Sequence, residues 1–207
     1  MGKRSRLFYT DLRFTRCTAA FAIQKQVARQ GLFGPTYDTY YGHLTAGHCA
    51  KEGRSWEHGG VVLGNGGYRN GAEFRSGADA QPIYIHDKLL VSRLLHESAN
   101  TSRSITSYQY AANDYVGQPV CQSGITSGKV CGTITNLGQT VQYSGCCIFD
   151  GQVFASYPSI AGDSGGPNYY GSTAMGVTSG VTGDKKMIYS QIEDALRTVA
   201  WDRLFTG

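Results

Sequence analysis

The chain has little proline, little charge and no long apolar run. Only 5 of its 207 residues are proline and 16% are charged, whereas 41% are hydrophobic. Disordered chains show the opposite balance, with high charge and low hydrophobicity. The composition therefore excludes a mainly disordered chain and favours one compact domain, or two fused halves, with a sizeable core.

Apolar stretches are short throughout the sequence. The longest apolar run near the N-terminus, residues 19–23, is shorter than the apolar segment of a secretory signal, and no stretch has the length of a transmembrane helix. We therefore expect no membrane partner. Signals and pro-segments are removed from mature secreted proteins, so their absence from this chain does not place it in the cytoplasm.

Positive charge is in slight excess and gathers at the N-terminus. The formal net charge is +4, and residues 1–16 contain five basic side chains against the single acid Asp11. The sequence has no nucleic-acid-binding motif, and its basic and aromatic residues do not interleave repeatedly. We expect no nucleic-acid partner, a basic arm over 1–16 and one folded domain over 17–207.

Glycine is abundant, with 28 residues, and it separates short runs rich in Thr, Ser, Tyr and Val. Such runs between glycine-containing turns are typical of antiparallel β-structure. We expect strands in two halves, about 17–104 and about 105–189, with a loop rich in Gly, Pro and Tyr over 31–42. A helix is predicted over about 190–204, because the capping box Ser-Gln-Ile-Glu opens this segment and apolar residues follow at helical spacing.

The six cysteines indicate the cellular compartment of the protein. Cys17 and Cys49 bracket a strand-like stretch, and Cys121 and Cys131 bracket a glycine-rich hairpin pattern. We predict two disulfides on this basis, and therefore an oxidising compartment, although the sequence alone leaves the pairing open. The absence of CxxC and HxxxH spacings argues against a zinc site. The adjacent cysteines 146 and 147 are compatible with a vicinal disulfide or with two thiols.

Residues 44–49 read Leu-Thr-Ala-Gly-His-Cys and place a histidine at the end of an apolar strand. A bond from Cys49 back to Cys17 would hold the imidazole of His48 in a fixed position. A general base must lie within reach of its nucleophile, with its other ring nitrogen oriented by a third group. An isolated histidine more often has a structural role. The remaining histidines have no ligand-like spacing, and we expect surface or packing roles for His43, His58, His86 and His96.

Residues 162–167 read Gly-Asp-Ser-Gly-Gly-Pro. Glycines on both sides let the backbone turn sharply, which presents the Ser164 hydroxyl in a cleft and aims the amides of Gly162 and Ser164 at a developing oxyanion. A Gly-Ser-Gly turn by itself is also typical of an ordinary β-turn. Its position in the chain, after the histidine motif, favours the catalytic interpretation. We expect Asp163 to have a structural role.

Together these two motifs resemble the signatures of chymotrypsin-type serine peptidases. The cysteine at 17, the hairpin over 121–132 and the segment 176–180 are similar to the bacterial streptogrisin and alpha-lytic protease branch. The resemblance extends from about residue 17 to the terminal helix. It implies an all-β fold of two packed six-stranded antiparallel β-barrels with a C-terminal α-helix.

In that family the triad follows the order His, Asp, Ser, which requires an aspartate between the two motifs. We predict Asp79, because a small residue and then an apolar strand follow it, as in the family; Asp87 and Asp114 are the alternatives. The resemblance then implies that Ser164 is the nucleophile and His48 the general base and later the general acid. Asp79 would orient the imidazole, and the amides of residues 162 and 164 would form the oxyanion hole.

The resemblance also implies a substrate pocket built from the segment before the nucleophile and from a later strand. Neither segment carries an acidic residue, so we expect cleavage after an apolar or small side chain. Asp184 lies nearby in the sequence and is the acid that could change this preference. The predicted substrate-binding residues are Pro158, Ser159, Thr178, Ser179 and Gly180.

These inferences predict a secreted serine endopeptidase that hydrolyses peptide bonds through an acyl-enzyme. It needs no metal or organic cofactor, because the imidazole activates the hydroxyl. Its partners would be protein or peptide substrates and, as in the bacterial branch, a removed pro-segment; we expect a monomer. Two alternatives stay open: a protease-like binding module with restricted or no turnover, and an esterase that uses the same triad.

Overall fold

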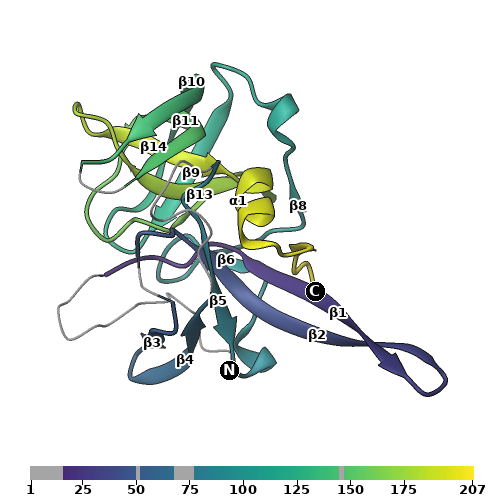
Figure 1. Ribbon diagram of the computed structural model, residues 1–207. Coiled ribbons are helices and arrows are strands. Elements are labelled where there is room, and N and C mark those ends of the chain that lie inside the picture. Colours follow the sequence, from purple (N-terminus) through teal and green to yellow (C-terminus); the bar gives the residue numbers. More distant parts are fainter. Residues whose placement is uncertain (1–15, 50–51, 68–76, 145–146) are drawn as a thin grey trace.

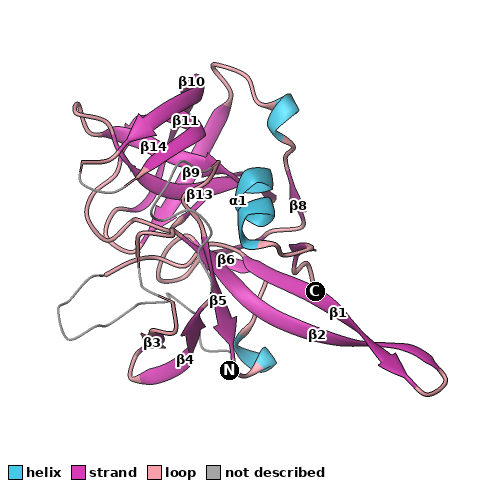
Figure 2. Ribbon diagram, viewed as in Figure 1, coloured by secondary structure: helices cyan, strands magenta, loops and turns pink. Residues whose placement is uncertain are grey.

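The computed structural model describes residues 16–49, 52–67, 77–144 and 147–207. The molecule consists mostly of strands, arranged in two halves, with a helix beside them and one long hairpin that extends outward (Figure 1, Figure 2). No helix in the described ranges is long and apolar enough to cross a membrane.

The first half is a six-stranded sheet with the strand order β15-β1-β2-β5-β4-β3. All neighbouring strands in it are antiparallel. No pairing among the described residues closes this sheet into a barrel. Its strands are β1 (Ala22–Gly31), β2 (Gly34–Thr45), β3 (Ser55–His58), β4 (Val61–Gly66), β5 (Gln81–Ile85) and β15 (Arg203–Leu204).

The second half contains a closed barrel. The sheet order is β12-β9-β10-β11-β14-β13-β8, and an additional pairing between β12 and β13 joins six of these strands into a ring. Its strands are β8 (Ser107–Tyr108), β9 (Pro119–Gly124), β10 (Gly128–Gln142), β11 (Ile148–Pro158), β12 (Pro167–Tyr170), β13 (Thr173–Val181) and β14 (Lys186–Gln191).

A connection with little regular structure joins the halves. It contains the 3₁₀ helix η1 (Lys88–Leu90), the small hairpin of β6 (Leu94–His96) and β7 (Ser102–Ser104), and the 3₁₀ helix η2 (Ala111–Asn113). The predicted all-β fold class with a C-terminal helix is confirmed, with the difference that the first half is an open sheet within the described residues.

The expected loop over 31–42 is wrong. Residues from 34 onward belong to β2, which pairs with β1 without a register shift from Ala22↔His43 to Gly31↔Gly34. The turn is reduced to Leu32 and Phe33. Threonine and tyrosine recur along this strand, and their β-propensity outweighs the turn signal of its glycine and proline residues.

The C-terminal helix α1 spans Ile192–Val199 and is shorter than predicted. It ends because Ala200 adopts a left-handed conformation with φ 53°, and the Ala200 N–H donates to the Arg197 and Leu196 carbonyls. The chain then turns back, and Leu204 pairs with Ile23 of β1. The terminal residues therefore complete the first sheet instead of extending the helix.

Three groups of buried side chains fill the interior. One lies within the first sheet around Trp56 and Ile83, and another lies inside the closed barrel around Val153 and Tyr189. The third combines residues from both halves with the helix, including Leu44 of β2, Val177 of β13 and Ile192 of α1. Burial of this shared apolar surface fixes the two halves against each other, which positions the segments that carry the two sequence motifs.

Candidate active site

His48 lies just beyond the end of β2, and a disulfide restrains the chain there. Cys49 is bonded to Cys17 with an S–S distance of 2.07 Å. The His48 side chain is 38% exposed, so one side of the ring faces solvent. Its Nδ1 lies 2.6 Å from Oδ2 of Asp79, and its backbone N–H donates to Asp79 Oδ1 at 3.0 Å.

Asp79 is the buried partner in this arrangement, with a side chain that is 0% exposed. Its Oδ2 also accepts a hydrogen bond from the Ser179 hydroxyl at 2.8 Å. Its backbone N–H donates to the Ser190 hydroxyl at 2.9 Å. A Cβ at position 47 would lie 3.1 Å from Asp79 Oδ1, which explains the fit of glycine before His48. The carboxylate is thus fixed by several independent contacts.

This geometry determines what the imidazole can do. A carboxylate at Nδ1 favours the tautomer with its proton on Nδ1, which leaves Nε2 as the acceptor. It also stabilises the imidazolium that forms after proton uptake. The competing aspartates have other partners: Asp87 caps η1 by accepting from the Leu89 N–H, and Asp114 accepts from Gln109 and Gln191.

The serine motif forms a tight turn that packs against the end of β2. Gly162 and Gly165 have positive φ angles of 102° and 80°. A Cβ at Gly165 would lie 2.2 Å from the Thr45 hydroxyl and 2.8 Å from the Ala46 nitrogen, so only glycine permits this approach. The Ser164 carbonyl accepts from the Thr18 N–H at 2.8 Å. The turn and the histidine segment are therefore neighbours in space.

Two amides of this turn are available to a ligand. Within the described chain, the N–H groups of Gly162 and Ser164 donate to no protein acceptor. Between them, the buried Asp163 carboxylate accepts from the backbone N–H groups of Thr126, Ser127 and Ile160. Those contacts hold the Asp163 side chain in the interior and give it a structural role.

The segments expected to form the substrate pocket are largely buried. The Thr178 hydroxyl accepts from Asn168 Nδ2 at 3.0 Å, and the Ser179 hydroxyl is engaged by Asp79. The Pro158 carbonyl accepts from Gln122, and Ser159 is buried. A Cβ at Gly180 would lie 2.4 Å from the Tyr143 hydroxyl. Because these polar side chains already have protein partners, a substrate would contact mainly backbone groups and small side chains.

Tyr143 is a site neighbour that the sequence did not reveal. Its hydroxyl lies 3.1 Å from the Ser179 hydroxyl, which in turn donates to Asp79. Burial raises the pKa of Tyr143 to about 12, and the nearby Asp79 carboxylate acts in the same direction. At neutral pH the Tyr143 hydroxyl therefore keeps its proton and can donate a hydrogen bond. It is one of 14 tyrosines in the chain, and nothing in the local sequence distinguishes it.

Among the described residues, one group of side chains has the spacing of metal ligands, and two of its members form a disulfide. Donor atoms of Cys17, His48 and Cys49 lie within 4.8 Å of one another. The two sulfurs are bonded to each other and the imidazole contacts Asp79, so this group does not fit a metal ion. The second predicted disulfide, Cys121–Cys131, is also present. Cys147 is disulfide-bonded too, and Cys146 lies outside the described residues.

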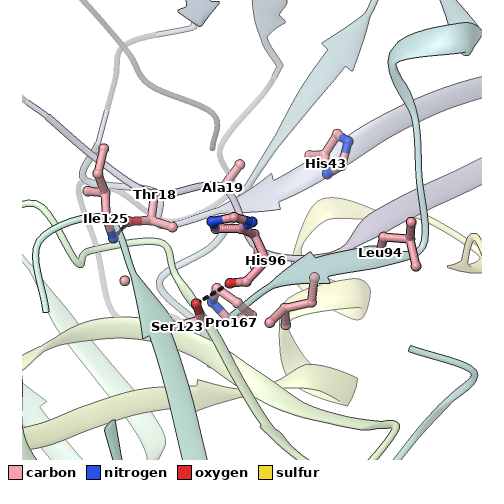
Figure 3. A pocket seen from close by; sticks show the side chains of 11 residues that line it. Thr18, Ala19, His43, Leu94, His96, Ser123, Ile125 and Pro167 are labelled. Carbon is pink, nitrogen blue, oxygen red and sulfur yellow. Dashed lines mark hydrogen bonds between the residues drawn. The ribbon is translucent and has the colours of Figure 1, made fainter. Parts of the chain in front are cut away.

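A small cavity lies between the two halves, close to the start of the described chain (Figure 3). Rings of His43 and His96 line it, and the Ser123 hydroxyl donates to the His96 carbonyl. Its volume of about 30 Å³ suits a water molecule and not a substrate side chain. Burial lowers the pKa of His43 to about 4, so this ring is neutral at physiological pH. A packing role for His43 agrees with this environment.

Comparison with known proteins assigns the family. The family model described as Trypsin matches residues 38–197. The chain belongs to the trypsin family. Serine protease 2 of Streptomyces fradiae is 34% identical over 169 residues, covering 82% of this chain and 88% of that protein. Glutamyl endopeptidase 2 of Streptomyces griseus is 33% identical, covering 82% of this chain and 80% of that protein.

A solved structure supports the same assignment. The crystal structure of Thermobifida fusca protease A has a TM-score of 0.73 and 28% identity, covering 97% of this chain and 96% of that one. The chain spans about half the length of some other curated relatives. The predicted enzyme class is confirmed: this trypsin-family member is a serine endopeptidase.

Proposed function

We propose that this trypsin-family peptidase is secreted and uses Ser164, His48 and Asp79 as its catalytic triad. The observation that carries the proposal is the 2.6 Å contact between His48 Nδ1 and the buried Asp79 carboxylate, on a ring that is partly open to solvent. A positioned imidazole with a carboxylate behind it is the base that serine hydrolysis requires. The glycine-bounded turn of Ser164 packs on the same strand end.

The reaction then proceeds by acyl transfer. His48 Nε2 takes the proton of the Ser164 hydroxyl as the serine oxygen bonds to the substrate carbonyl carbon. The unpaired amides of Gly162 and Ser164 stabilise the resulting oxyanion. His48 gives the proton to the leaving amine, and the acyl-enzyme is hydrolysed by a water molecule that His48 activates in the same way.

Cleavage after an apolar or small side chain is the specificity that the surroundings support. The pocket segments carry no charged side chain between residues 156 and 161 or between 178 and 180. Asp184, the acid near them in the sequence, has a 60% exposed side chain and pairs with Lys186 at 2.8 Å. It is therefore engaged at the surface, so a basic side chain would find no buried carboxylate in these segments.

Secretion is supported by the cysteine chemistry. Cys17–Cys49 and Cys121–Cys131 are disulfides, and Cys147 is also disulfide-bonded. Several disulfides in one small protein point to an oxidising compartment, because the cytosol keeps thiols reduced. Our proposal includes a pro-segment that is removed on maturation and a monomeric mature enzyme that acts on protein or peptide substrates.

A fluorophosphonate probe tests the triad directly. The wild-type chain should be labelled at one serine, and Ser164→Ala should abolish labelling and peptide hydrolysis together. Ser107→Ala, which changes an exposed serine in β8, is the control and should retain both. Absence of labelling and turnover in the wild type would favour a binding module, while turnover of a matched ester but not of its amide would favour an esterase.

A further inference from the structure

The outer part of the β1–β2 ribbon has a backbone edge that no described strand covers. β5 pairs with β2 only from Gly42 to Thr45. Further out, β1 is the sole described neighbour of β2, as far as the Gly31↔Gly34 pair. Figure 1 shows this ribbon extending away from the rest of the molecule. Residues 34–41 of β2 thus have one paired edge and one open edge.

Hydrogen bonds near the base of the ribbon show which residues face the open edge. The Leu44 N–H donates to the Phe21 carbonyl at 2.9 Å, and the Leu44 carbonyl accepts from Ala20 at 2.7 Å, so Leu44 bonds toward β1. Backbone groups alternate between the two edges of a strand, and the register with β1 has no shift. The residues whose N–H and C=O groups face outward are Tyr37, Thr39 and Tyr41.

This edge lacks the usual protection against strand pairing. Exposed edges in native proteins are normally blocked by lysines, prolines, bulges or very short strands. Pro35 blocks the outermost position of this edge, but residues 36–41 contain no lysine and no proline, and the pairing with β1 contains no bulge. A regular strand with an open edge is a template for another extended chain.

A groove of about 650 Å³ runs beside this edge. Residues 39–41 line one wall, and residues 84–88 line the other. The residues Tyr40 and Tyr84 are 41% and 39% exposed. Tyr84 contacts Trp201 at a centroid distance of 5.4 Å, which supports its ring from one side. Partly exposed tyrosines that are already positioned provide contact area at a low entropic cost.

We propose that the open edge of β2 and this groove bind an extended polypeptide by strand addition, as an exosite for unfolded protein substrates. The backbone groups of Tyr37, Thr39 and Tyr41 would pair with the added chain. Its alternate side chains would lie on the tyrosine rings. The proposal rests on the peptidase activity of the family and not on the assignment of the triad.

The exosite is separate from the place where the bond is cleaved. Thr39 lies six residues from Thr45 along β2, which corresponds to about 20 Å at about 3.3 Å per residue. A substrate must therefore be longer than about six residues to reach both places. A tetrapeptide amide cannot occupy the exosite and the cleavage site together, whereas an unfolded protein can.

Thr39→Pro tests the proposal, with Ala28→Pro as its matched control. Proline at position 39 removes an outward N–H and keeps the bonds to β1. Ala28 faces the opposite edge of the ribbon, because the N–H of Gln26, two residues before it, donates outward to Asp202 at 2.7 Å. Reduced, carboxymethylated lactalbumin and a chromogenic tetrapeptide amide serve as the long and short substrates. Thermal unfolding checks that both variants fold.

Thr39→Pro should raise KM for carboxymethylated lactalbumin by about five- to tenfold, since one hydrogen bond is lost and the proline ring obstructs the edge. KM and kcat for the tetrapeptide should stay within about twofold, and Ala28→Pro should leave both substrates unaffected. Equal effects of the two prolines, or of one proline on both substrates, would overturn the proposal. A wild-type dimer that Thr39→Pro dissociates in sedimentation experiments would also overturn it and identify a second copy as the occupant.

Discussion

Glu97 provides the sharpest test of how the linking segment is held against the second half. It follows β6, and its carboxylate accepts from Arg103 at 2.6 Å, from Lys129 at 2.9 Å and from the Tyr169 hydroxyl at 2.8 Å. Arg103 belongs to the small hairpin, whereas Lys129 and Tyr169 belong to the closed barrel. One carboxylate therefore connects the linking segment to the second half.

The pKa of Glu97 gives the expected magnitude. Burial opposes ionisation, but the hydrogen bonds from Arg103, Lys129 and Tyr169 outweigh it and lower the pKa from 4.5 to about 2. At about 1.36 kcal/mol per pH unit, this difference corresponds to about 3 kcal/mol of folding stability. Because the folded-state pKa is the lower one, the stabilisation is fully present above pH 4.5. It is lost as the pH falls toward 2.

Glu97→Gln should lower the free energy of unfolding by about 3 kcal/mol at pH 6, and the difference from wild type should shrink to below about 1 kcal/mol near pH 2. Urea unfolding followed by tyrosine and tryptophan fluorescence at both pH values measures this. Asp184→Asn is the control, since its exposed pair with Lys186 is screened by solvent and its loss should leave the free energy of unfolding nearly unchanged. A Glu97→Gln difference that is the same at both pH values would refute the reasoning.

Two substitutions examine the carboxylate behind the imidazole. Asp79→Asn should reduce kcat/KM for a tetrapeptide amide by roughly 10⁴-fold, because an amide at Nδ1 favours the wrong tautomer of His48; a loss below tenfold would argue against this role. Tyr143→Phe should reduce kcat/KM by about two- to tenfold through the Ser179 hydroxyl. Since burial raises the pKa of Tyr143 to about 12, that loss should be constant between pH 7 and 10 in matched rate profiles. A loss that disappears at pH 10 would show that the phenol ionises in this range.

Short sequence motifs predict the segments to which we assign the chemistry. The Thr-Ala-Gly-His-Cys and Gly-Asp-Ser-Gly-Gly-Pro motifs carry their own local geometry, since glycines permit the backbone angles that the serine turn requires. Cysteine positions likewise predicted both disulfides that the described chain contains in full. The predicted length of the C-terminal helix and the predicted loop over residues 31–42 were wrong. Their boundaries depend on the pairing of the terminal residues with β1 and of β2 with β1.

The amino-acid sequence by itself determined the β-rich composition, the disulfides and the identity of the histidine and serine segments, because these depend on residue type and local spacing. The sequence pattern favoured Asp79 over Asp87 and Asp114, and the tertiary structure shows that Asp79 is the aspartate that contacts His48. It also decided that Tyr143 stands behind Ser179 and that no described strand pairs with the outer edge of β2. Contacts between distant segments set the position of Tyr143 and the edge of β2, and no local pattern in the chain encodes these two features.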